Sequence, residues 1–94
     1  MISEVRVYKL FIPQSNSLKR KRGTVKPIIE RLKNRFNVSV IELSGNDVWQ
    51  RADIAVSLLS NDREQAENEL REIEKFIEFS GEVLITDVTK SPYE

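Results

Sequence analysis

Two segments decide how this chain folds: Asn34-Arg35-Phe36-Asn37-Val38-Ser39-Val40 and Asp47-Val48-Trp49-Gln50-Arg51-Ala52-Asp53. In the first segment, a basic helical stretch ends and residues that favour a strand begin. We expect this strand at 37–44. Gly45-Asn46-Asp47 has the composition of a turn. A longer strand is predicted after it, at 48–59. Two strands joined by such a turn are expected to pair as an antiparallel hairpin.

Upstream of these segments, residues 2–12 are rich in side chains that favour strands. Alternation along this strand divides its side chains between two faces. One face carries Tyr8, Leu10 and Ile12, and the other carries Val5, Val7, Lys9 and Phe11. Apolar residues on both faces are typical of a central strand whose second face is covered by a partner.

A basic helix is predicted from Leu18 to Phe36, with Ser17 as its N-cap. Pro27 conflicts with this helix, because proline removes one backbone hydrogen bond and clashes with the carbonyl four residues earlier. That earlier residue is Gly23, which makes local distortion easier. Two outcomes stay open: a kinked helix, or a loose basic turn followed by a firm helix from about Thr24.

The second half of the chain predicts one more helix and one more strand. Asn61 is expected to cap the helix, with Glu64 completing a capping box, and Ser80-Gly81 to end it. Its predicted buried stripe is Ala66, Leu70, Ile73 and Ile77. A last strand is expected at 82–89, followed by a loose tail at 90–94.

The predicted order is therefore β-α-β-β-α-β within a single domain spanning residues 1–94. Two split βαβ units with right-handed crossovers give one antiparallel sheet of four strands, with both helices on one face. This is an α+β fold of the ferredoxin-like type.

The composition excludes several kinds of chemistry. The chain has 94 residues, of which 39% are hydrophobic and 32% are charged, and it contains no cysteine or histidine. Disulfides, thiol nucleophiles and Ser-His-Asp triads are therefore absent, and no metal or cofactor is predicted. The sequence shows neither a signal peptide nor an apolar run long enough to cross a membrane. We expect a cytoplasmic protein, and the absence of histidine disfavours an enzyme without excluding one.

The charges are unevenly distributed although the net charge is zero. Between Lys19 and Arg35 there are eight basic residues and one acid, Glu30. Between Asp62 and Glu82 there are eight acids and three basic residues. The sequence therefore predicts one basic helix and one acidic helix in the same domain.

The start of the basic helix is the candidate anion-binding site. Free backbone N–H groups at a helix start favour negative charge, and the cations that follow would strengthen binding to phosphates of RNA. The predicted site residues are Ser15, Ser17, Lys19, Arg20, Lys21 and Arg22. The alternative is a solvated basic face that pairs with the acidic helix.

A second candidate surface is the sheet face that the helices leave open. Its apolar residues would be exposed in a monomer, which predicts a homodimer or the docking of another protein. The predicted interface residues are Val5, Val7, Phe11, Ile41, Leu43, Trp49 and Arg51. Trp49 has an alternative role in closing one end of the core, with Arg51 pairing to Asp47 or Asp53.

Four motifs in this order resemble the bacterial YlxP-like family, domain of unknown function 503. They are Ser15-Asn16-Ser17-Leu18-Lys19-Arg20-Lys21-Arg22, Asn34-Arg35-Phe36-Asn37-Val38-Ser39-Val40, Asp47-Val48-Trp49-Gln50-Arg51-Ala52 and Ser60-Asn61-Asp62. The resemblance covers nearly the whole chain and implies a ferredoxin-like fold without a settled activity. Genes of that family often lie beside those for a translation initiation factor and a ribosome-maturation factor, which implies contact with RNA or the ribosome. Gly23 and Pro27 depart from the uninterrupted helix of relatives.

Three functions remain open. The first is RNA or ribosome binding through the basic helix start, without catalysis. The second is a protein-interaction module that uses the open sheet face and Trp49, as a homodimer or with another partner. The third is an enzyme that acts on a phosphorylated small molecule at the Ser15–Ser17 loop. None of them involves a membrane.

Overall fold

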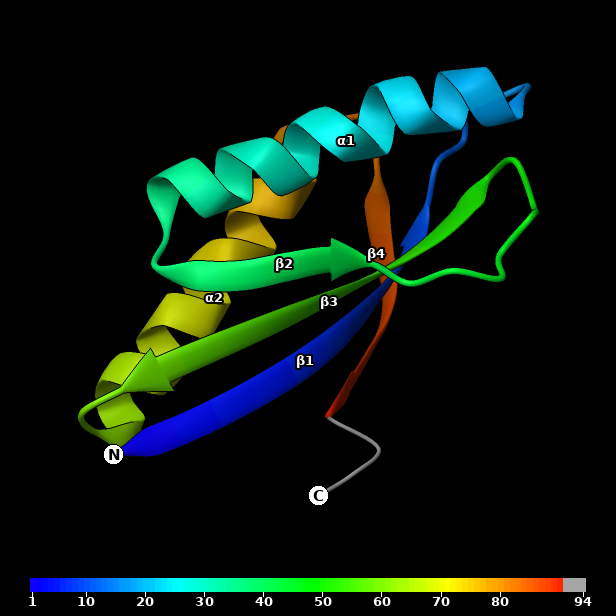
Figure 1. Ribbon diagram of the computed structural model, residues 1–94. Coiled ribbons are helices and arrows are strands. Elements are labelled where there is room, and N and C mark those ends of the chain that lie inside the picture. The colour runs from blue at the N-terminus through cyan, green and yellow to red at the C-terminus, as the bar shows by residue number, and fades with distance from the viewer. Residues whose placement is uncertain (91–94) are drawn as a thin grey trace.

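The computed structural model describes residues 1–90 and has the predicted ferredoxin-like architecture (Figure 1). The elements are β1 (Ile2–Phe11), α1 (Leu18–Arg35), β2 (Val38–Glu42), β3 (Arg51–Ser60), α2 (Arg63–Phe79) and β4 (Leu84–Lys90). The sheet order is β2-β3-β1-β4, and every neighbouring pair is antiparallel. None of the helices in this part of the chain is long and apolar enough to cross a membrane.

The core lies between one face of the sheet and the two helices. The predicted alternation in β1 is confirmed, because Tyr8, Leu10 and Ile12 are all buried. The predicted stripe of α2 is also buried. Side chains that build the main core from the other elements include Val25, Ile28, Leu32, Val40, Ile54 and Val56. Both helices thus cover one face, and the opposite face stays open.

Helix α1 runs without interruption from Leu18 to Arg35 with Pro27 inside it, so the predicted late start near Thr24 is wrong. Ser17 is the N-cap, as predicted, and its hydroxyl accepts a hydrogen bond from the backbone N–H of Arg20 at 3.0 Å. Proline cannot donate to the carbonyl of Gly23. Because Gly23 is exposed, water can hydrate that carbonyl, which lets the helix continue.

Several predicted boundaries need correction. Strand β2 is Val38–Glu42 rather than 37–44, and β4 begins at Leu84 rather than at residue 82. The N-cap of α2 is Asp62 rather than Asn61, and its carboxylate accepts the backbone N–H of Gln65 at 2.8 Å. The residue at N3, where a capping box has its second member, is therefore Gln65 and not Glu64. Strand β3 begins three residues later than predicted, which leaves a longer loop at 43–50. Strand β4 includes Lys90, and the rest of the predicted tail, residues 91–94, lies outside the described residues.

Strand β4 pairs with β1 through an irregular register. The partner of Lys9 is Asp87 and the partner of Leu10 is Ile85, so Thr86 is an extra residue on β4. The hydroxyl of Thr86 donates a hydrogen bond to the backbone carbonyl of Lys9 at 3.1 Å. This arrangement is a β-bulge on an edge strand.

An ionic cluster joins the start of β1 to the start of α2. Glu4 is only 7% exposed, and its carboxylate lies 2.7 Å from the guanidinium groups of both Arg6 and Arg63. The hydrogen bond from Arg6, and to a smaller extent the one from Arg63, lowers the pKa of Glu4. Further along β1, Tyr8 donates a hydrogen bond to Glu74 at 3.2 Å, and burial raises the pKa of its phenol. Polar groups at this end of the core are thus satisfied locally.

Candidate functional site

Two loops that are far apart in the sequence meet at one end of the sheet, on the right in Figure 1. They are the β1–α1 loop (residues 12–17) and the β2–β3 loop (residues 43–50). The backbone N–H of Ile12 donates to the carbonyl of Gln50 at 2.8 Å. The side-chain amide of Gln50 donates to the carbonyl of Pro13 at 3.3 Å. The predicted anion site and the loop that carries Trp49 therefore form one surface.

Lys21 differs from the basic residues around it. Its side chain is 4% exposed, and the ammonium group donates to the carbonyls of Asn46 at 2.6 Å and Val48 at 3.1 Å. This lysine thus ties the first turns of α1 to the β2–β3 loop. Lys21 therefore holds α1 against the β2–β3 loop, whereas Lys19, Arg20 and Arg22 are exposed.

The two serines predicted at the anion site are engaged in local hydrogen bonds. Ser15 is buried, and its hydroxyl donates to the carbonyl of Ser17 at 3.1 Å. The hydroxyl of Ser17 is the N-cap acceptor already described. Both hydroxyls therefore define the loop and the helix start, and exposed cations are the groups on this surface best placed for a ligand.

Seven of the eight basic residues of α1 are exposed. At about 100° per residue, four of them fall within roughly 60° of the helix circumference. We call these four the basic stripe: Lys19, Arg22, Lys26 and Lys33. The stripe is about 21 Å long, at 1.5 Å per residue. Lys26 and Lys33 were not among the predicted site residues, although their helical spacing from Lys19 and Arg22 is visible in the sequence.

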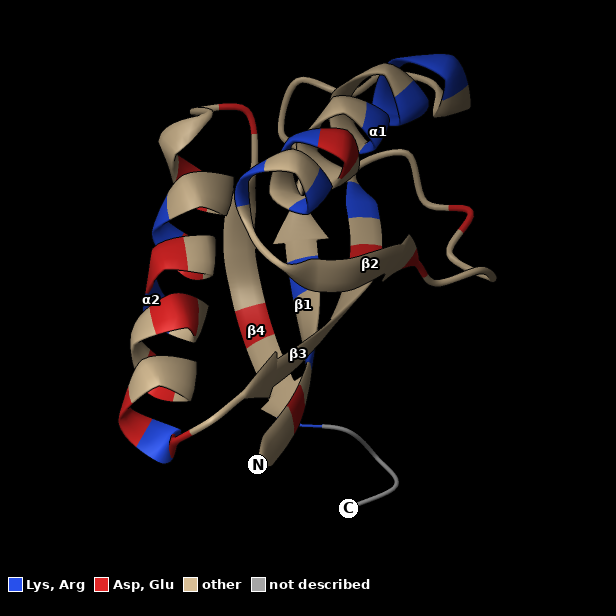
Figure 2. Ribbon diagram, turned by 60° about the vertical axis from the view of Figure 1, so that its left-hand side comes forward, with Lys and Arg blue, Asp and Glu red and all other residues tan. Residues whose placement is uncertain are grey.

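The basic helix is not neutralised by the acidic helix. Figure 2 shows α1 carrying most of the blue and α2 most of the red. Within residues 1–90, ion pairs join Glu4 to two arginines and Lys75 to Glu72, and none involves α1. Near its end, the guanidinium of Arg35 lies over the rings of Phe36 and Phe76, at 5.8 and 5.6 Å. The alternative in which the two helices pair is therefore not what the structure shows.

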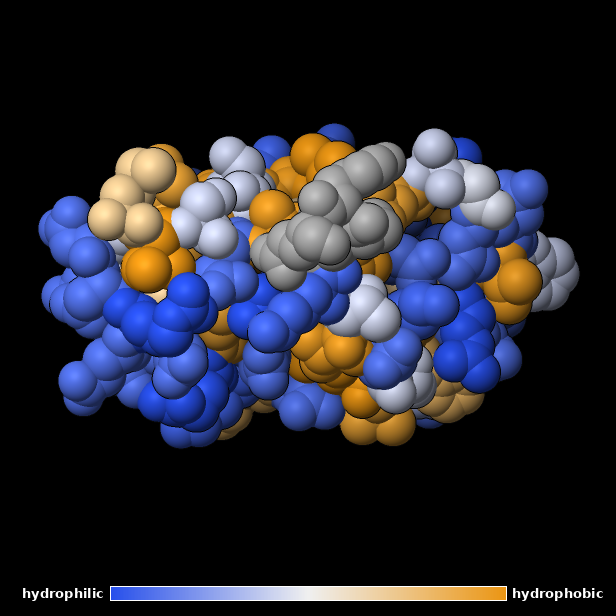
Figure 3. Space-filling model, turned by 90° about the horizontal axis from the view of Figure 1, so that it is seen from below, coloured by the Kyte–Doolittle hydropathy of each residue, from blue (hydrophilic) through white to orange (hydrophobic). Residues whose placement is uncertain are grey.

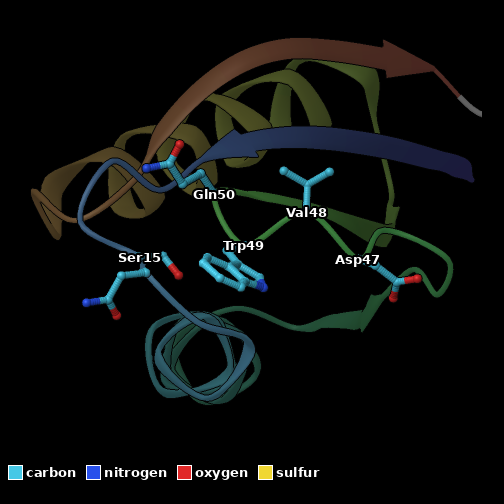
Figure 4. A pocket seen from close by; sticks show the side chains of 6 residues that line it. Ser15, Asp47, Val48, Trp49 and Gln50 are labelled. Atoms are coloured by element: carbon cyan, nitrogen blue, oxygen red, sulfur yellow. The ribbon is translucent and has the colours of Figure 1, made fainter.

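Trp49 lines an open pocket of about 560 Å³ between the two loops. The other lining residues are Ser15, Asn16, Asp47, Val48 and Gln50. Figure 4 shows the indole of Trp49 between the β1–α1 loop, which carries Ser15, and the β2–β3 loop, which carries Trp49 itself. Trp49 is 54% exposed, so about 100 Å² of its mostly apolar surface is in contact with water. The alternative in which Trp49 closes the core is wrong.

Arg51 also differs from its predicted alternative role. Its guanidinium lies 5.3 Å from the centre of the Phe11 ring, on the open face of the sheet. Its side chain forms no ion pair with Asp47 or Asp53, both of which lie in the described region. A cation over an aromatic face is a favourable contact, and it covers part of Phe11.

On the open face of the sheet, a charged row across three strands divides the apolar residues. Val5, Val7, Phe11 and Leu43 are half-buried there, and Ile41 is 59% exposed. Two exposed leucines that the sequence analysis missed, Leu59 and Leu84, extend this face. Lys9 stands between Asp53 and Asp87 in the register. Seen from below, Figure 3 shows apolar patches separated by hydrophilic side chains.

No metal site emerges from the described part of the chain, which contains no group of three or more suitable side chains. Three surfaces are candidates for binding a ligand or a partner: the basic stripe, the Trp49 pocket and the open face. The first two adjoin each other, because Asn16 lines the Trp49 pocket and also a neighbouring pocket with Lys19 and Arg20.

Comparisons with known proteins agree with this fold. The family described as "Protein of unknown function (DUF503)" matches residues 4–90. The Bacillus subtilis (strain 168) protein named "Uncharacterized protein YlxP" is 39% identical over 72 residues, which are 77% of this chain and 78% of that protein. The solution NMR structure of a de novo designed protein with a ferredoxin fold has a TM-score of 0.56 at 16% identity, covering 97% of this chain and 84% of that one.

Proposed function

The chain belongs to the DUF503 family, and we propose that it is a cytoplasmic RNA-binding protein whose contact surface is the basic stripe of α1. The stripe itself is the observation that carries the proposal. Its four cations lie along one side of a helix, are exposed, and form no ion pair within residues 1–90. A row of unpaired cations about 21 Å long suits a row of backbone phosphates.

The charge distribution supports an oriented contact. Net charge is zero, so the chain as a whole has no general attraction for polyanions. The acidic surface of α2 repels phosphate, and the RNA is thereby confined to the α1 side. Phosphate contacts of this kind position a protein on RNA without reading its sequence. Ribosomal RNA is the natural first ligand to test.

The sheet itself is a poor surface for RNA. Domains of this topology that stack bases on their central strands need aromatic residues there. Strand β3 (Arg51–Ser60) has none, and Phe11 on β1 is covered by Arg51. The helix side of the molecule is therefore the better contact surface.

Binding to ribosomal RNA measured over a salt series tests the proposal. Four phosphate contacts predict a slope of log K against log salt of about −3. Replacing Lys19 and Arg22 with glutamate should weaken binding at least tenfold at low salt and reduce the slope by about half. Glutamate is favourable near a helix start, so this variant should fold.

A matched control carries the same change in net charge elsewhere. Arg71 and Lys75 are exposed on α2, and the double glutamate variant at these positions should bind nearly as well as the unmodified protein. Absence of binding at low salt, or equal losses in both double variants, would refute the stripe as the RNA contact.

The open sheet face favours a second candidate function, self-association. Ile41, Leu59 and Leu84 are all exposed on this face. The four strands have 10, 5, 10 and 7 residues, so at about 3.3 Å per residue and about 4.8 Å between strands the sheet covers about 500 Å² per copy. Stable interfaces bury about 800 Å² per partner. We therefore propose a homodimer that is weak and dissociates on dilution.

Sedimentation velocity from low to high micromolar concentration tests the homodimer. The unmodified chain should shift towards the dimer as concentration rises, and Ile41→Lys should keep it monomeric. Phe79→Lys is the matched control, because Phe79 is 91% exposed on α2, away from the open face. A chain that stays monomeric at high micromolar concentration contradicts this candidate.

A further inference from the structure

The structure points to a nucleobase site: we propose that the pocket beside Trp49 holds one unpaired base of the bound RNA, stacked on the indole. The inference rests on the proposed RNA-binding function and makes it more specific, because a base can enter this pocket only from a single-stranded segment. The basic stripe holds the backbone, and Trp49 takes a base.

Trp49 is exposed on a loop that hydrogen bonds hold in place. Lys21 donates to the carbonyl of Val48, immediately before the tryptophan, at 3.1 Å. Ile12 donates to the carbonyl of Gln50, immediately after it, at 2.8 Å. The backbone is thus fixed on both sides of an indole that is half in water. A preordered aromatic surface loses little entropy when a ligand stacks on it.

The walls of the pocket carry side chains that suit a nucleobase. The lining of the Trp49 pocket combines the indole with the polar side chains of Asn16, Asp47 and Gln50. In the described part of the chain, the side chains of Asn16 and Asp47 make no hydrogen bond and are exposed. An amide offers both donors and an acceptor, and a carboxylate accepts from an amino group. Aromatic stacking with edge contacts is how unpaired bases are bound.

The Trp49 pocket lies beside exposed cations of α1. Asn16 lines both the Trp49 pocket and the pocket that contains Lys19 and Arg20. A base in the first pocket therefore has its own phosphates beside these two cations. A positively charged track with an aromatic beside it is the usual arrangement for single strands. This continuity favours a nucleotide over an uncharged protein side chain as the occupant.

Trp49 reports on its own site, because it is the only tryptophan in the chain. Titration with a single-stranded oligoribonucleotide should quench its fluorescence, while an abasic strand of the same length should bind through its phosphates without stacking quenching. A duplex of the same sequence should likewise bind without it. Trp49→Ala should weaken single-strand binding about tenfold and leave duplex binding unchanged. Trp49→Phe should restore most of the lost affinity.

The outcomes separate the two proposals. If binding stays salt-dependent and sensitive to Lys19 and Arg22 but the fluorescence and the Trp49→Ala affinity are unchanged, the base site is wrong and the RNA-binding proposal stands. If no RNA binds at low salt, both are wrong. Equal losses for single strand and duplex in Trp49→Ala also refute the base site. Thermal melting of each Trp49 variant checks that it is folded.

Discussion

Replacing Lys21 with methionine is expected to lower the free energy of unfolding by about 2–3 kcal/mol. Methionine keeps the aliphatic stem but removes the ammonium that donates to the carbonyls of Asn46 and Val48. A hydrogen bond from a charged donor contributes about 1.5–3 kcal/mol. The relief from burying the ammonium charge offsets part of the sum of the two. Urea denaturation followed by circular dichroism measures the difference.

The control for Lys21 is a neighbour with the same side chain. Lys19 is exposed on the same helix, so Lys19→Met should change the free energy of unfolding by less than about 0.5 kcal/mol. If both variants are equally stable, the hydrogen bonds of Lys21 contribute little to the fold.

A second large effect is expected for Ile54→Ala, which should destabilise the protein by about 3–4 kcal/mol. Ile54 is fully buried on the helix-facing side of β3, where truncation leaves a cavity between sheet and helices. Ile41→Ala is the matched change on the open face, and in the monomer it should cost less than about 1 kcal/mol because the side chain is 59% exposed. Urea midpoints at low protein concentration, where any dimer has dissociated, give both values. Similar losses would mean that the two faces do not differ as described.

The fold could be predicted from the sequence because its signals are local and repeated. The alternation of Tyr8, Leu10 and Ile12 gave the buried face of β1, and the stripe of α2 gave its packing side. Pro27 misled one prediction, because the sequence does not say whether the carbonyl of Gly23 can reach water. The cap of α2 was misplaced by one residue, since Asn61 and Asp62 are both good N-cap residues.

The site was harder to predict, because it depends on two loops meeting. Four consecutive basic residues look alike in the sequence, yet Lys21 is buried under the β2–β3 loop. A signal for this existed: Lys21 has the same helical spacing as Val25, Ile28 and Leu32, which are buried. Trp49 was predicted in a strand because its side chain favours strands. Hydrogen bonds between the loops, which no local pattern reveals, place it outside the sheet.

The extra residue in β4 affects whether copies of this protein can pair along the edges of their sheets. A free sheet edge is a template on which a strand of another copy can pair side by side, and repeated pairing leads to fibrils. One edge here is β2, which is only five residues long. The other is β4, where Thr86 breaks the ladder and turns its hydroxyl to the neighbouring strand. Neither edge offers a long regular row of backbone groups, so the fold resists growth into open-ended fibres even though its open face carries apolar patches.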